Sequence, residues 1–141
     1  MEVIIIPILA SIAVMALGKK NQIWMSALLS MLPLIFIAQF FNHVGVDGGW
    51  KTLFDQPWIS DNIRFTTGFD GLTGILLLLT NILVPVIILG GIRNDENRVK
   101  ITALTLFMQG ALNGVFMAQD GLMFYIFWEL ALIPIYFITL T

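Results

Sequence analysis

The sequence has no cysteine and only one histidine, and these absences exclude several kinds of site. Without cysteine, the chain forms no disulfide framework and no thiolate-ligated metal or iron–sulfur centre. One histidine, His43, does not make a histidine metal cluster by itself. The sequence also has no basic patch for nucleic acid, no glycine-rich phosphate loop and no nucleophile–base pair. We therefore expect no catalytic residue and no cofactor-binding or metal site in this chain.

Charge is also scarce, whereas apolar residues are abundant. Charged residues make up 11% of the 141 residues and hydrophobic residues 58%, against about 25% and 45–50% in soluble domains. This composition predicts an integral membrane protein. Glu2 precedes the first apolar run and Lys19 and Lys20 follow it, which is the reverse of a secretory signal and favours an outside N-terminus.

Apolar runs predict a single all-α membrane domain, residues 1–141, with five transmembrane helices. Each run is near the ~20 residues that cross a bilayer, and Lys19 and Lys20 can extend the short first one. Pro85 in the third span and Pro134 in the fifth each remove a backbone N–H, so we expect the helix to kink or break there. The predicted helices cover about 3–17, 23–41, 72–92, 99–118 and 121–141.

Residues 42–70 are predicted to form a long external loop. Trp50 and Trp58 are placed to lie at a membrane interface, and residues 63–66 could form a short strand. A metal site is a weak alternative, because the spacing of the polar residues lacks the alternating ligands of a calcium loop. The ligands of such a site would be His43, Asp47, Asp55, Asp61 and Asp70.

Positive charges predict the orientation of the spans. By the positive-inside rule, the more basic connections face the cytoplasm, so the N-terminus and the long loop lie outside. Asp120 then begins the fifth helix at its outer end, where a carboxylate suits the helix dipole. The basic side contains Lys19, Lys20, Arg93, Arg98 and Lys100, and the other side contains Lys51 and Arg64.

Glu129 is the one acid inside a predicted span. Insertion scales put an ionised acid there at roughly 2.5–3.5 kcal/mol, so such residues usually face a protein interior or water and serve a function. The alternative is a neutral, hydrogen-bonded packing acid. Pro134 adds a second polar group, because the carbonyl of Leu130 loses its helical donor.

The fourth span has a polar stripe. Thr102, Thr105, Gln109 and Asn113 share one helix face, and Gly110 and Gly114 form a small-xxx-small pair beside it. Hydrogen bonding between helices and a solvated proton path both fit this pattern, so Gln109, Asn113 and Thr105 are candidates for either role. In the third span, Pro85 deprives the carbonyl of Asn81 of its donor.

Two segments resemble the antiporter-like subunits of respiratory complex I, above all subunit M, the NADH dehydrogenase subunit 4 family. One is Gly-Val-Phe-Met-Ala-Gln-Asp at 114–120, followed by Phe-Tyr-Ile-Phe-Trp-Glu-Leu-Ala-Leu-Ile-Pro at 124–134. The other is Gly-Phe-Asp-Gly at 68–71. The resemblance covers essentially the whole chain, and its Trp-Glu-Leu-x-Leu-Ile-Pro core is specific.

The resemblance implies a proton-translocating membrane-arm subunit of NADH:quinone oxidoreductase, in the bacterial inner membrane. Its partners would be the lipid bilayer and the other membrane-arm subunits, and NAD(H) and quinone would be bound by other subunits of the complex. The fold would be the first part of an antiporter-like inverted-repeat bundle. Glu129 matches the family's fifth-helix glutamate, which pairs with a lysine on the seventh helix and modulates its proton affinity.

This sequence stops at Thr141, before any position for that lysine. We therefore expect an N-terminal piece of a longer subunit that does not pump alone. A subunit of a multisubunit Na⁺/H⁺ antiporter or a membrane-bound hydrogenase is the nearest alternative. A non-transporting membrane scaffold is a second alternative.

Overall fold

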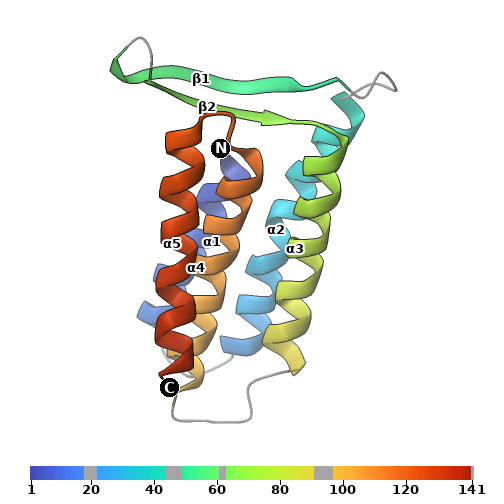
Figure 1. Cartoon of the computed structure of the whole chain (residues 1–141). Coiled ribbons are helices and arrows are strands. Elements are labelled where there is room, and N and C mark those ends of the chain that lie inside the picture. Colours follow the sequence, from blue (N-terminus) through green and yellow to red (C-terminus); the bar gives the residue numbers. More distant parts are fainter. Residues whose placement is uncertain (18–21, 44–48, 61–62, 91–96, 141) are drawn as a thin grey trace.

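Five helices and a two-stranded hairpin make up the computed structural model, which describes residues 1–17, 22–43, 49–60, 63–90 and 97–140. The helices lie side by side, and the hairpin crosses one end of the bundle (Figure 1). Helix α4 packs against α1, α3 and α5. The elements are α1 (Glu2–Leu17), α2 (Gln22–His43), β1 (Lys51–Ser60), β2 (Ile63–Phe69), α3 (Gly71–Gly90), α4 (Arg98–Met117) and α5 (Gly121–Thr139).

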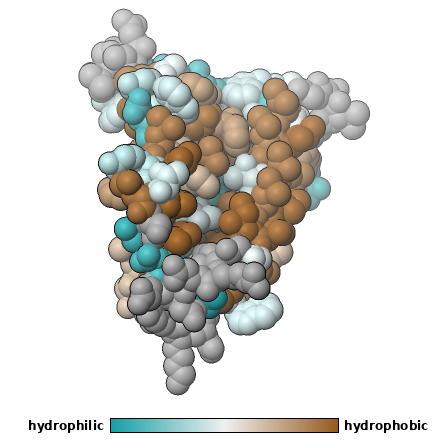
Figure 2. Space-filling model, turned by 60° about the horizontal axis from the view of Figure 1, so that its bottom comes forward, coloured by the Kyte–Doolittle hydropathy of each residue, from teal (hydrophilic) through white to brown (hydrophobic). Residues whose placement is uncertain are grey.

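The helices confirm the predicted all-α membrane fold. Within the described residues, α2, α3, α4 and α5 are long and apolar enough to cross a membrane, whereas α1 has 16 residues and is shorter. Large apolar side chains are exposed along the helices, and they form broad areas on the face drawn in Figure 2. Such surfaces suit lipid rather than water.

The two ends of the bundle differ in charge, in the sense that the sequence predicted. Lys51 and Arg64 lie in the hairpin, at the same end as the N-terminus, whereas α4 begins with Arg98 and Lys100 at the opposite end (Figure 1). Lys19, Lys20 and Arg93 lie outside the described residues. We call the hairpin end the outer end, after the sequence prediction that it lies outside.

Prolines do not interrupt the helices, contrary to our expectation of breaks. Helix α3 continues through Pro85 and α5 continues through Pro134, and both side chains are buried. Helices α1 and α2 likewise run through Pro7 and Pro33. In a bundle, neighbouring helices restrain the chain and supply donors to the freed carbonyls, so proline is tolerated.

The segment expected to be a loop contains a β-hairpin instead. The strand predicted at 63–66 is confirmed as part of β2, and β1 pairs with it antiparallel, with Asp55 opposite Thr66. Strand β1 was not predicted because Pro57 and the polar residues of this segment are unfavourable in strands. The hairpin is held to the bundle by the α4–α5 turn, where the N–H of Gln119 donates to the carbonyl of Thr66 at 2.9 Å and Thr67 bridges to Ala118.

The two glycines of α4 face different helices. A Cβ at Gly110 would lie 2.9 Å from the Ile4 carbonyl oxygen of α1, so the glycine permits close backbone approach there. A Cβ at Gly114 would collide with the ring of Phe127 on α5. The small-xxx-small pair therefore fits α4 between α1 and α5.

Candidate functional site

Asp120 caps the start of α5, and the buried face of this helix determines the direction in which Glu129 points. Asp120 is the predicted N-cap of this helix, because its Oδ1 accepts from the N–H groups of Leu122 and Met123 at 2.8 and 3.3 Å. The side of α5 that packs into the bundle contains Met123, Phe127, Ala131 and Pro134. With 3.6 residues per turn, Glu129 lies on the opposite side.

Glu129 is exposed on this side of α5, which faces away from the bundle, and its neighbours there are mostly apolar. Tyr125, one turn earlier, interacts through its hydroxyl with the Glu129 carboxylate, and Ile133 and Tyr136 are exposed on the same face. Among the described residues, no salt bridge involves Glu129. Because the tyrosine hydroxyl is neutral, an ionised carboxylate in this position still needs a positive partner or water from outside the five helices.

A buried amide network, formed by Asn81, Gln109 and Asn113, occupies the interior of the bundle. Each of the three residues is fully buried. Asn81 Oδ1 accepts from Gln109 Nε2 at 2.6 Å and from Asn113 Nδ2 at 3.3 Å, and Asn81 Nδ2 donates to Asn113 Oδ1 at 2.9 Å. The amide network thus joins α3 to α4 inside the membrane.

The same network reaches α1 and α2 through backbone carbonyls. Gln109 Nε2 donates to the Ser30 carbonyl at 2.8 Å, and Asn113 Nδ2 donates to the Val3 carbonyl at 2.8 Å. Val3 precedes Pro7 by four residues, so Pro7 leaves this carbonyl without its helical donor. Our sequence analysis missed this contact, although the same proline rule applied to Pro7 would have indicated a free carbonyl at Val3.

The rest of the predicted stripe does not join the amide network. Thr105 Oγ1 donates within its own helix to the Ile101 carbonyl at 2.8 Å. The hydroxyl of Thr102 and the Oε1 of Gln109 are buried without a partner among the described residues. Glu129 faces away from α4, so the structure does not bring it together with Gln109, Asn113 or Thr105.

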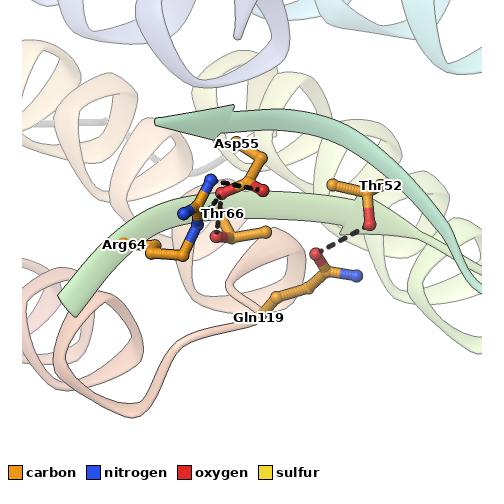
Figure 3. Close-up of polar contacts among 5 residues, drawn as sticks. All are labelled: Thr52, Asp55, Arg64, Thr66 and Gln119. Carbon is orange, nitrogen blue, oxygen red and sulfur yellow. Dashed lines mark hydrogen bonds and ion pairs between the residues drawn. The ribbon is translucent and has the colours of Figure 1, made fainter. Parts of the chain in front are cut away.

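The outer end of the structure has a second polar group, in the hairpin. Arg64 donates to both oxygens of Asp55, at 2.7 and 2.9 Å, and Thr66 Oγ1 donates to Asp55 Oδ1 at 3.0 Å (Figure 3). The hydrogen bonds from Arg64 are the main reason that the pKa of Asp55 lies below its ordinary value of 3.8.

Two of the acids that the sequence offered as metal ligands have other contacts in the structure. Asp55 pairs with Arg64, and Asp70 Oδ1 accepts from the N–H of Thr73 at 2.7 Å, at the start of α3. The side chains of His43, Asp47 and Asp61 lie outside the described part. In the part that is described, no three His, Asp or Glu side chains gather as a metal site would require.

Removing the Arg64 charge is expected to raise the pKa of Asp55. The lowered pKa means that the ion pair supports the hairpin fully above pH 3.8 and that this support is lost as pH falls through the lowered pKa. In Arg64→Gln, the pKa should move up toward 3.8, as an NMR titration of the Asp55 carboxyl would show. Thr66→Val is the control and should cause a smaller change; an unchanged pKa in Arg64→Gln would contradict the pairing.

Known proteins are similar to this chain over most of its length. No protein-family model matches the chain. It is 32% identical to the chloroplast NAD(P)H-quinone oxidoreductase chain 4 of Mesostigma viride, over 96% of this chain and 28% of that protein. It is 29% identical to NADH-quinone oxidoreductase subunit M of Escherichia coli strain K12, over 88% of this chain and 23% of that one.

A third relative belongs to a different dehydrogenase. The F(420)H(2) dehydrogenase subunit M of Methanosarcina mazei is 42% identical over 54% of this chain and 16% of that protein. The chain spans about a quarter of the length of the quinone oxidoreductase relatives. Along most of its length, the chain is homologous to subunit M, or chain 4, of the NAD(P)H-quinone oxidoreductases, as the resemblance predicted.

Proposed function

We propose that this chain forms part of a membrane-arm subunit of NADH:quinone oxidoreductase, in which electron transfer from NADH to quinone drives proton translocation. The observation that carries the proposal is the similarity to subunit M and chain 4 proteins along nearly the whole chain. Glu129, an acid exposed on the apolar side of a membrane helix, supports it independently.

In this proposal, Glu129 is a charge on the proton path and acts through a basic partner outside the five helices. Opposite charges favour each other's ionised form, typically by 1–3 pKa units. When the partner moves closer or farther away, its proton affinity changes, and this change controls whether the partner binds or releases a proton. Gln109 and Asn113 would hold the helices that support α5, because their amides are already hydrogen-bonded between helices.

The redox chemistry belongs to other subunits in this proposal. NAD(H) and quinone would bind there, and this chain would contribute no cofactor ligand. The membrane would be a bacterial inner membrane with the N-terminus outside. The end-to-end difference in charge supports this orientation, because Arg98 and Lys100 lie opposite the hairpin and the N-terminus.

Co-purification tests the assignment most directly. The tagged gene product should be isolated from gently solubilised membranes and its partners identified by mass spectrometry. We expect NADH- and quinone-binding subunits to be recovered with it. Recovery of Na⁺/H⁺ antiporter or hydrogenase subunits, or of no partner at all, would contradict the proposal.

A second candidate changes the electron donor while keeping the membrane role. The 42% identity to a subunit of F(420)H(2) dehydrogenase favours it over part of the chain. In that case, the same purification would recover an F420H2-oxidising subunit in place of an NADH-oxidising one. Glu129 would keep the role proposed above.

A further inference from the structure

An open pocket of about 560 Å³ lies at the outer end, between the hairpin and the α4–α5 turn. It is separate from Glu129, which lies more than two turns along α5. A pocket of this volume accommodates a small polar ligand or headgroup. Three of its lining residues appear in Figure 3. The lining consists of Trp50, Arg64, Thr66, Ala118, Gln119 and Asp120.

Packing around Gly68 positions two walls of this outer pocket. A Cβ at Gly68 would lie 2.5 Å from Gln119 Nε2 and 2.6 Å from Trp50 Nε1, so both side chains lie directly against the glycine. Thr52 Oγ1 donates to Gln119 Oε1 at 3.2 Å, which leaves the Gln119 amide nitrogen as a donor (Figure 3). An indole and an amide donor are therefore held at the pocket rather than free to rotate.

The charged residues of the outer pocket are equal in number and opposite in sign. Arg64 is oriented by its two bonds to Asp55. Asp120 uses Oδ1 for both of its capping bonds, and its Oδ2 has no hydrogen bond among the described residues. Because Asp55 already offsets the Arg64 charge, Asp120 makes the pocket favour a positive group, and a ligand that also has a negative group can contact Arg64 as well.

The surroundings point to a lipid as the source of that ligand. The pocket lies at the ends of helices that are long and apolar enough to cross a membrane, and tryptophan is enriched where such ends meet lipid headgroups. In the first two turns of α5, next to Asp120, Leu122 and Tyr125 are exposed, so acyl chains can lie against the helix there. A soluble ligand would not need this contact.

We propose that the outer pocket binds the headgroup of a zwitterionic phospholipid. The phosphate contacts Arg64. The ammonium contacts Asp120 Oδ2 and the face of the Trp50 indole, which attracts cations. The proposal does not depend on the complex in which the chain works, so failure of the co-purification above would leave it standing.

Native mass spectrometry of the whole chain in detergent tests this proposal, with an equimolar mixture of dioleoyl phosphatidylethanolamine and dioleoyl phosphatidylglycerol. We expect phosphatidylethanolamine to be retained in about fivefold excess, as one partly exposed ion pair can give. Asp120→Asn should remove or reverse this preference, because asparagine caps a helix as well as aspartate but has no charge.

Asp70→Asn is the matched control, since Asp70 caps α3 at the same end and does not line the pocket. It should leave the lipid preference unchanged. Equal retention of the two lipids by the unaltered chain, or an equal loss in Asp70→Asn, would overturn the proposal. Glycerophosphoethanolamine should compete weakly; binding as tight as that of the lipid would assign the pocket to a soluble phosphate ester instead.

Discussion

Replacing Glu129 by glutamine is expected to reduce proton translocation at least tenfold while the protein still folds and assembles. Glutamine keeps the size and hydrogen-bonding capacity of the side chain and removes its charge. Losing a paired charge shifts the pKa of a basic partner by 1–3 units, and each unit changes its protonation ratio tenfold. Folding should be unaffected because the side chain is exposed on α5 and makes no salt bridge among the described residues.

The measurement is proton uptake by inverted membrane vesicles, with quinone reduction followed in parallel. Thr139→Val is the control on the same helix, because the Thr139 hydroxyl donates to a backbone carbonyl of α5 itself, that of Tyr136. It should leave translocation unchanged. Full translocation in Glu129→Gln would remove Glu129 from the proton path and leave it as a packing acid.

Replacing Asn81 by leucine is expected to destabilise the bundle by about 2 kcal/mol. Asn81 makes three hydrogen bonds to α4, and bonds between membrane helices average about 0.6 kcal/mol each. Leucine has the same number and branching of side-chain heavy atoms as asparagine and leaves no cavity, so the loss should come mainly from the bonds. Unfolding in mixed detergent micelles, followed by circular dichroism, measures the change in the free energy of unfolding.

Thr80→Val separates the amide network from a general effect of polarity. Thr80 is the neighbouring residue of α3, and its hydroxyl donates at 3.0 Å to the Leu76 carbonyl of the same helix. The free energy of unfolding should change little in this variant. If both substitutions had the same effect, the bonds between helices would not be what stabilises the bundle.

Local features of the fold could be predicted from the sequence because they depend on neighbouring residues. The apolar runs located the helices, and Asp120 identified the start of α5 because capping involves residues two and three positions on. The hairpin was harder to predict. Strand β2 is held by Ala118 and Gln119, about fifty residues farther along the chain, and no local pattern shows such a contact.

The candidate site was predicted only in part, because spacing within one helix could be seen in the sequence but contacts between helices could not. The spacing of Gln109 and Asn113 predicted one shared face, and both are buried in the amide network. The spacing could not show that these amides donate to the Val3 and Ser30 carbonyls, because the carbonyls belong to other helices, although Pro7 indicates that the Val3 carbonyl is free. Glu129 stood out by its chemistry, but its direction was known only once the packed side of α5 was known.

The bond between Asn113 and the Val3 carbonyl also sets an order of events during synthesis. The two residues are 110 positions apart, and a ribosome adds about 5–20 residues per second. The first helix therefore waits roughly 5 to 20 s for the side chain that replaces its missing donor. During that interval, lipid headgroups, water or the insertion machinery must satisfy the Val3 carbonyl, so α1 reaches its final position only after α4 has been made.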